Sequence, residues 1–145
     1  MTIRRLLLTF VAAVLVAAAP AGARVDARPS LTVASSDYGR IVFDGRGFAL
    51  YAFTADRRGR SVCDGECAKA WPPYLVKGQV RAGPATKQRL LGTIRRADGS
   101  RQLTYAGRPL YYYVGENRPH LVLCQNVREF GGLWLVVRPS GALVR

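Results

Sequence analysis

The sequence contains an internal repeat at an offset of 60 residues, and this repeat limits the possible folds more than any other feature. Residues 47–56, GFALYAFTAD, align without a gap on residues 107–116, GRPLYYYVGE. The glycine, the leucine and the first tyrosine are identical, and the second aromatic residue and the final acid are conservative matches. Each copy continues to one cysteine and one tryptophan, namely Cys63 and Trp71 or Cys124 and Trp134. Repeats of this length usually mean that two units complete one hydrophobic core together.

Short runs of branched and aromatic residues alternate with turn residues from Leu31 onward, a rhythm typical of an all-β fold. The expected strands are 31–35, 40–44, 48–54, 89–96, 101–105, 109–114, 133–138 and a short final strand at 142–145. One short helix is expected near residues 64–70, because Asp64 can cap it and the two prolines after Trp71 must end it.

The two copies, about 33–76 and 89–141, are expected to form one small antiparallel sheet or barrel, with residues 77–88 as their connection. Each copy should contribute a matching hairpin to this sheet. The largest repeated side chains should then be buried, namely Leu50, Tyr51, Trp71, Leu110, Tyr111 and Trp134.

The N-terminus has the three regions of a secretory signal peptide in order: two arginines, the apolar stretch 6–19 and the small residues 21–23. A membrane anchor is the alternative, but a spanning helix needs about 20 apolar residues and Pro20 ends this stretch short. Cleavage before Arg24 would leave residues 24–145 as a single domain. We expect this mature chain to be a periplasmic or secreted, soluble monomer without a transmembrane segment.

The chain is strongly basic, with a formal net charge of +13, and 19 of its 22 basic residues are arginines. Such a charge favours anionic partners such as nucleic acid, lipid headgroups or cell-wall polymers. The arginines cluster only at 57–60 and 95–96, and neither cluster is interleaved with aromatic residues as a base-stacking groove would be. We therefore expect no nucleic-acid partner. An anionic envelope surface is the expected weak partner.

Longer motifs resemble a known family. Residues 50–56, LYAFTAD, are followed by 61–68, SVCDGECA, and by Trp71-Pro72-Pro73, and this succession resembles the bacterial secreted-repeat lipoproteins. Residues 102–111 and 131–137 resemble the second copy of that family. The family is one of unknown function, so the resemblance implies export and architecture rather than an activity. This chain has no cysteine just after the expected cleavage site that could carry a lipid, which argues against a lipid anchor.

The repeated motif offers candidate site residues: Tyr51, Phe53 and Asp56 in the first copy, and Tyr111, Tyr113 and Glu116 in the second. The two aromatic residues of each copy lie on one face of a strand, and the acid lies at the strand end. In the structural interpretation the aromatics fill the core and each acid accepts hydrogen bonds within its own copy. In the functional interpretation they form a ligand cleft with aromatic walls. We favour the structural interpretation, with the following arginine neighbours: Arg57, Arg58 and Arg60 for Asp56, and Arg118 for Glu116.

Cys63 and Cys67 lie four residues apart, a spacing that brings their Cα atoms to about 6 Å on a helical turn. Because disulfides persist in exported proteins, we favour a local disulfide between them and no metal. The alternative is a metal-handling or redox protein in which Cys63, Cys67, His120 and Cys124 form a tetrahedral site for zinc or cuprous ion.

Catalytic residues are few, because the chain has one histidine and lacks a serine elbow, a phosphate loop and a His-Glu-x-x-His motif. A Cys–His nucleophile pair would have to combine Cys124 with His120. The sequence therefore favours an exported, non-catalytic binding or structural module of the bacterial envelope, without a cofactor. The metal-handling interpretation stays open as the alternative.

Overall fold

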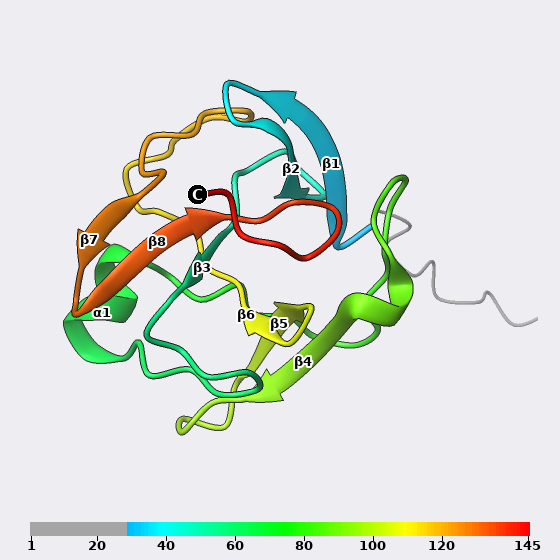
Figure 1. Ribbon diagram of the computed structural model, residues 1–145. Helices are drawn as coiled ribbons and strands as arrows, with labels where there is room; N and C mark the ends of the chain where they lie inside the picture. The colour runs from blue at the N-terminus through cyan, green and yellow to red at the C-terminus, as the bar shows by residue number, and fades with distance from the viewer. Residues whose placement is uncertain (1–28) are drawn as a thin grey trace, which may run out of the picture.

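The computed structural model describes residues 29–145, so the signal peptide predicted at 1–23 lies outside the described residues. The described chain is mostly β, which confirms the predicted fold class (Figure 1). Its strands are β1 (Leu31–Ser36), β2 (Gly39–Asp44), β3 (Tyr51–Phe53), β4 (Leu91–Arg95), β5 (Arg101–Tyr105), β6 (Arg108–Pro109), β7 (Val127–Glu129) and β8 (Gly132–Val136).

Two short helices accompany the strands, α1 (Gly65–Ala70) and the 3-10 turn Gln88–Leu90. Helix α1 is the predicted helix, and it ends at Trp71, just before the two prolines. Asp64 occupies the N-cap position, but its side chain forms no capping hydrogen bond, so that part of the prediction is wrong. Within residues 29–145, no helix has the length and apolar character needed to cross a membrane.

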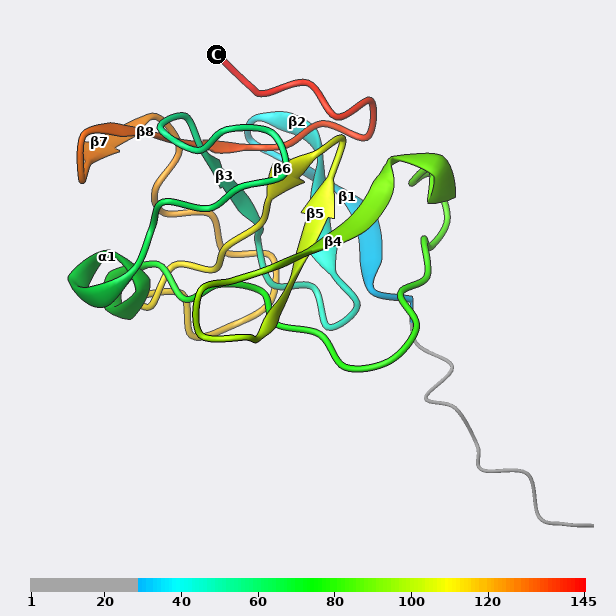
Figure 2. The same ribbon diagram turned by 90° about the horizontal axis from the view of Figure 1, so that it is seen from below.

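The strands form three small antiparallel sheets, with the orders β1-β2, β3-β8-β7 and β4-β5-β6. This corrects the expectation of one continuous sheet or barrel, at least in the part of the chain that the structure describes. Figures 1 and 2 both place α1 at the β7–β8 end of the molecule, away from β4. The strands are two to six residues long, and they pack as three separate sheets rather than as one continuous sheet.

The hairpin turns follow the glycines that the sequence places there. Between β2 and β3 the backbone nitrogen of Gly47 donates to the carbonyl of Asp44 at 3.0 Å, and Gly47 has a φ of +91°. That left-handed conformation costs glycine little, because glycine has no Cβ. The turn reverses the chain so that Phe43 faces Ala49 in an antiparallel bridge.

The segment that follows each tryptophan inserts into the other copy. In the first copy, β3 has β8 of the second copy beside it, and Val42 of β2 donates its N–H to the carbonyl of Val137 at 2.8 Å. The second copy shows the same pattern with the roles reversed, because Leu103 of β5 donates its N–H to the carbonyl of Tyr74 at 2.8 Å. Each copy therefore completes the β-structure of its partner.

The six repeated side chains expected in the core are all fully buried, which confirms that prediction. They divide between two hydrophobic clusters. One contains Tyr51, Tyr111 and the two tryptophans, and the other contains Leu50 and Leu110 together with residues of β2 and β5.

Two predicted strands were wrong, and one strand was missed. The expected strand 109–114 is replaced by the two-residue β6 and an isolated bridge at Tyr111, because this segment follows Pro109, which has no N–H to donate. The expected final strand 142–145 is only a bridge between Val137 and Leu143. Strand β7 was not predicted, since residues 127–129 lack the apolar alternation of a half-buried strand.

Candidate functional site

The repeated tyrosines meet backbone to backbone at the centre of the molecule. The N–H of Tyr51 donates to the carbonyl of Tyr111, and the N–H of Tyr111 donates back to the carbonyl of Tyr51, each at 2.9 Å. Because equivalent residues of the two copies face each other here, this bridge marks the pseudo-two-fold axis that relates the copies.

Each repeated acid accepts a hydrogen bond from the tyrosine of the other copy. The hydroxyl of Tyr111 donates to Oδ2 of Asp56 at 2.6 Å, and the hydroxyl of Tyr51 donates to Oε1 of Glu116. Each acid also accepts a backbone N–H from its own copy, from Val62 or Leu123 at 2.8 or 2.9 Å. The acids do not meet in one cleft; they join the two copies at two separate places.

This arrangement partly corrects the expected environment of the acids. The backbone contacts lie within each copy as expected, but the tyrosine contacts cross between copies. The expected arginine pairs are wrong, because the ion pairs among the described residues are Arg46–Asp44 and Lys69–Glu66. Burial raises the pKa of both Asp56 and Glu116 above their usual values, although the hydrogen bonds that they accept oppose the shift.

We expect Asp56→Asn and Glu116→Gln each to lower the free energy of unfolding by about 1–2 kcal/mol at pH 4 or below, because each amide loses part of a buried hydrogen-bond network. Raised folded-state pKa values mean that the unfolded chain loses its protons first as the pH rises. The stability that the neutral carboxyls give is therefore complete below their unfolded-state pKa values and is lost as the pH rises through the folded-state values. Urea unfolding at pH 3, 5 and 7 measures this effect. The difference in free energy of unfolding between parent and variants should shrink as the pH rises, and a difference that grows with pH would contradict the prediction.

The aromatic residues of the motif surround a stacked pair of tryptophans. The rings of Trp71 and Trp134 lie 4.0 Å apart with their planes at 2°. Phe53 stacks on Trp134 at 4.3 Å, and Tyr113, its counterpart in the second copy, packs on Trp71 at 4.9 Å. The indole nitrogen of Trp71 donates to Glu129, whereas that of Trp134 is buried with no hydrogen-bond partner in residues 29–145. These contacts make the motif aromatics the packed centre of the core.

The structure joins Cys63 and Cys67 in a disulfide, the pairing that the sequence favoured. Cys124 has a buried free thiol, and burial raises its pKa. The ring of His120, the fourth residue of the alternative metal site, packs 5.2 Å from the ring of Phe43. No group of three or more His, Cys, Asp or Glu residues among the described residues could hold a metal ion, so the alternative four-residue metal site is wrong.

A thiol count gives a direct check of these cysteines. We expect no rapid reaction of the native protein with a water-soluble thiol reagent, because the one free thiol is buried. One thiol should react in denaturant without a reductant, and three should react after reduction. Three reactive thiols in denaturant alone would show that the disulfide is absent.

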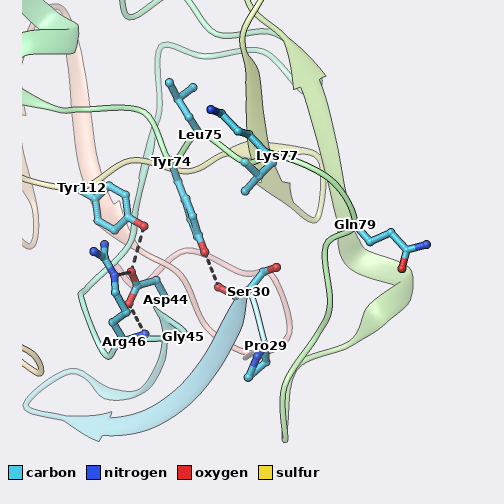
Figure 3. A pocket seen from close by; sticks show the side chains of 11 residues that line it. Pro29, Ser30, Asp44, Gly45, Arg46, Tyr74, Leu75, Lys77, Gln79 and Tyr112 are labelled. Atoms are coloured by element: carbon cyan, nitrogen blue, oxygen red, sulfur yellow. Dashed lines mark hydrogen bonds and ion pairs between the residues drawn. The ribbon is translucent and has the colours of Figure 1, made fainter. Parts of the chain in front are cut away.

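A surface cleft is lined by residues 29–30, by the turn after β2, by residues 74–77 and 79 and by Tyr112 of the second copy (Figure 3). We call it the tyrosine cleft; its volume is about 420 Å³ and its lining is Pro29, Ser30, Asp44, Gly45, Arg46, Tyr74, Leu75, Val76, Lys77, Gln79 and Tyr112. The rings of Tyr74 and Tyr112 lie 5.1 Å apart. The hydroxyl of Tyr74 donates to the carbonyl of Ser30 at 3.0 Å, which holds the N-terminal end of β1 against the cleft.

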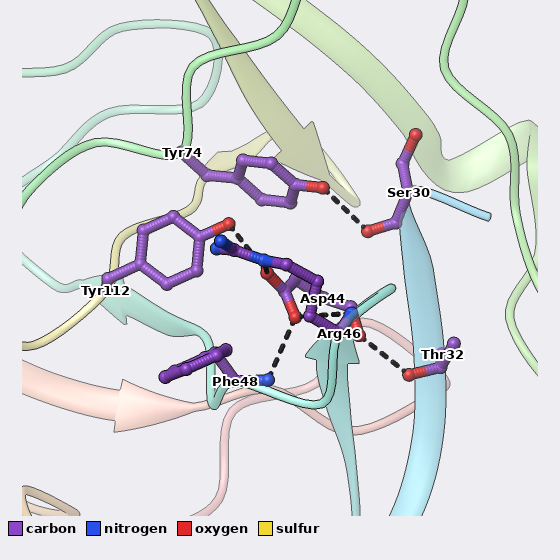
Figure 4. Close-up of polar contacts among 7 residues, drawn as sticks. All are labelled: Ser30, Thr32, Asp44, Arg46, Phe48, Tyr74 and Tyr112. Atoms are coloured by element: carbon purple, nitrogen blue, oxygen red, sulfur yellow. Dashed lines mark hydrogen bonds and ion pairs between the residues drawn. The ribbon is translucent and has the colours of Figure 1, made fainter. Parts of the chain in front are cut away.

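The buried carboxylate of Asp44 organises the floor of this cleft (Figure 4). It accepts hydrogen bonds from the backbone nitrogens of Arg46 and Phe48 at 2.8 and 2.9 Å. The Nε of Arg46 and the hydroxyl of Tyr112 also donate to it, at 2.9 and 3.1 Å. Four donors leave Asp44 fully occupied, so its role is to position the groups around it.

Arg46 is the charged side chain that Asp44 holds in place in the lining of the cleft. Its guanidinium lies over the rings of Phe48 and Tyr112, at 5.0 and 5.9 Å from their centroids. The hydrogen bond to Asp44 raises the pKa of Arg46 further, and its side chain is 60% exposed. The cleft therefore presents a cation, Arg46, that is held beside the rings of Phe48 and Tyr112.

Sequence reasoning missed the tyrosine cleft. Asp44, Arg46 and Tyr74 lie outside the repeated motif, and Tyr112 lies within it at a position where the two copies differ. The only signal was a difference between the copies, because Tyr112 stands where the first copy has Ala52.

Comparison with known proteins supports the repeat. A family model described as a secreted repeat of unknown function matches two tandem regions, residues 32–74 and 92–138. These regions together cover more than half of the 145 residues. Comparisons with curated proteins and with solved structures found no match.

Proposed function

The chain belongs to the family of secreted repeats of unknown function, and on that premise we propose that it is an exported, non-catalytic binding module of the bacterial envelope with the tyrosine cleft as its ligand site. The signal peptide predicted at residues 1–23 would direct its export. The observation that carries the proposal is the cleft itself, in which a positioned arginine and two tyrosine rings line a cavity of about 420 Å³.

A non-catalytic role is supported by how the candidate reactive groups are used. The carboxylates of Asp56, Glu116 and Asp44 each accept several hydrogen bonds from the fold. The thiol of Cys124 is buried with a raised pKa, which keeps it in the less nucleophilic protonated form. The ring of His120 packs on Phe43 rather than on an acid or a nucleophile.

The chemistry of the cleft favours a small polar ligand with one apolar face, as a sugar ring of an envelope glycan has. Aromatic rings supply flat apolar surface, and a few placed polar groups supply orientation, which is the usual composition of small-molecule sites. Arg46, Lys77 and Gln79 line the cavity and can donate hydrogen bonds to hydroxyl or carbonyl oxygens. Its volume falls in the range of sites that hold ligands of this size.

A titration with diacetylchitobiose, followed by two-dimensional NMR, tests the proposal. We expect saturable shifts at the residues that line the tyrosine cleft, and a loss of affinity of about tenfold in Tyr112→Ala, which removes one of the two rings. Tyr38→Ala is the matched control, because Tyr38 is exposed and does not line the cleft. Absence of shifts at the cleft, or equal losses in the two variants, would overturn the assignment.

A further inference from the structure

The repeat places a second cleft at the position equivalent to the tyrosine cleft. We call it the arginine cleft; its volume is about 520 Å³ and its lining is Arg58, Arg89, Leu90, Ala106, Gly107, Arg108, Ser140, Gly141 and Ala142. Pro29, Ser30 and Arg46 of the tyrosine cleft correspond to lining residues 89, 90 and 106 at the repeat offset of 60. Lys77 and Gln79 correspond to residues 140 and 142 at the offset of 63 that also separates the two tryptophans.

The equivalence is one of backbone position, and the side chains have diverged. In the tyrosine cleft the cation Arg46 is neutralised by Asp44. The arginine cleft has no acidic residue in its lining, and it gathers three arginines from three separate segments of the chain. We propose that the arginine cleft is a second binding site, specific for a ligand that carries a phosphoryl group.

The three guanidinium groups have no partners in the fold. Among residues 29–145, none of Arg58, Arg89 and Arg108 donates a side-chain hydrogen bond or forms an ion pair. The Nε of Arg108 is moreover buried, and nothing in the described part of the chain accepts a hydrogen bond from it. A buried N–H that is left unpaired costs free energy, so most such groups in native proteins have a partner or bind one. The terminal nitrogens of the three guanidinium groups are the donors that remain for an oxyanion in the cleft.

The local charge is also unbalanced. Burial lowers the pKa of Arg108, and repulsion by the neighbouring charges of Arg58 and Arg145 lowers it further. The stem of Arg58 packs over Gly107, the residue just before β6, where an added Cβ would lie 3.6 Å from Cγ of Arg58. An anion between these groups removes the repulsion as well as filling the unpaired donors.

A phosphoryl group fits these features better than a single carboxylate does. Arginine binds phosphate oxygens through two parallel N–H groups, and a dianion offers enough oxygens for several arginines at once. The cavity is larger than phosphate alone, so the group would be carried on a larger molecule, either a soluble phosphate ester or a phosphate-bearing envelope component. The shared chemistry is the phosphoryl group, and the two sources need separate experiments.

Calorimetric titration of the full mature chain with glycerol 3-phosphate, pyrophosphate and inorganic phosphate tests the soluble source. Flotation with phosphatidylglycerol vesicles, against vesicles of phosphatidylcholine alone, tests the membrane source. We expect saturable binding of at least one of these phosphoryl probes, at constant ionic strength set with chloride. We also expect the melting temperature of the protein to rise with that probe.

Arg108→Ala should weaken the binding at least tenfold, and Arg89→Ala provides a second variant at an exposed position. Arg108→Lys keeps the charge but loses the paired donors, so it should recover only part of the affinity. Arg128→Ala is the matched control, because it removes one exposed arginine of β7 outside the cleft. Equal losses in Arg108→Ala and Arg128→Ala would show that the basic surface attracts phosphate without a site, and absence of saturable binding to every probe would also overturn the proposal.

The inference extends the proposed binding function but can fail separately from it. Tyr112→Ala should leave phosphoryl binding within twofold of the parent, and Arg108→Ala should leave the diacetylchitobiose shifts unchanged. If the phosphoryl probes bind and the sugar does not, the arginine cleft stands and the assignment of the tyrosine cleft falls. Loss of both ligands in both variants would contradict two separate sites.

Discussion

Trp71→Ala and Trp134→Ala should each lower the free energy of unfolding by about 3–5 kcal/mol, the typical cost of truncating a large core aromatic residue. Both side chains are fully buried and stack on each other at 4.0 Å. Each also contacts a tyrosine of the motif edge to face, Trp71 with Tyr51 and Trp134 with Tyr111. Removing either ring therefore opens a cavity against both copies of the repeat at once.

Urea unfolding of the two variants and of the double variant measures this effect. The double variant should lose less than the sum of the single losses, because each tryptophan lines the cavity that the other leaves. Phe130→Ala is the control, since Phe130 is a large aromatic residue that is 48% exposed. If both tryptophan variants unfold within experimental error of the parent, the stacked pair is not the centre of the core.

Tyr51→Phe should cost about 1–3 kcal/mol, because it removes one hydroxyl and leaves the carboxyl of Glu116 without a tyrosine donor in a buried place. The same hydroxyl accepts the backbone N–H of Cys124 at 3.3 Å, so a second buried group loses its partner. The ring itself is kept, so the change tests the hydrogen bonds and not the packing.

Double-mutant cycles distinguish the crossed pairing from pairing within one copy. Tyr51→Phe combined with Glu116→Gln should show a coupling of at least 0.5 kcal/mol, as residues in one hydrogen-bond network do. Tyr51→Phe combined with Asp56→Asn should be additive within about 0.5 kcal/mol, because these two residues share no hydrogen bond. The opposite pattern would mean that each tyrosine serves the acid of its own copy.

Much of the fold could be predicted from the sequence because its signals are local. The alternation of apolar and turn residues identified β1, β2 and β5 almost to the residue. The spacing of Cys63 and Cys67 on a short helix is likewise a local feature, and the disulfide follows from it.

The pairing of segments that are far apart in the sequence could not be predicted in the same way. A repeat indicates that two units share a core, but it does not say whether a strand pairs within its own copy or with the other one. The insertion of β8 beside β3, and of the segment around Tyr74 beside β5, pairs residues too far apart in the sequence for a local pattern to indicate. For the same reason the acids were expected to find partners within their own copies.

Neither cleft could be predicted from the motif residues, because those residues are used in the core. The clefts form at the positions where the copies differ in sequence, such as Tyr112 against Ala52 and Pro29 against Arg89. A search for equivalent positions with different chemistry, rather than for matching positions, would have found both.

The insertion of each tryptophan segment into the other copy has a consequence for how such a molecule can arise. A chain with one copy would lack the neighbouring segment that pairs with its own strands. Two such chains could supply this segment to each other as a symmetric homodimer, with the bridge that corresponds to Tyr51–Tyr111 on its axis. The segment 77–88 turns that association between molecules into an event within one chain, at an effective concentration that dilution does not change. Two halves joined in one chain need not be identical, and the linings of the two clefts differ accordingly.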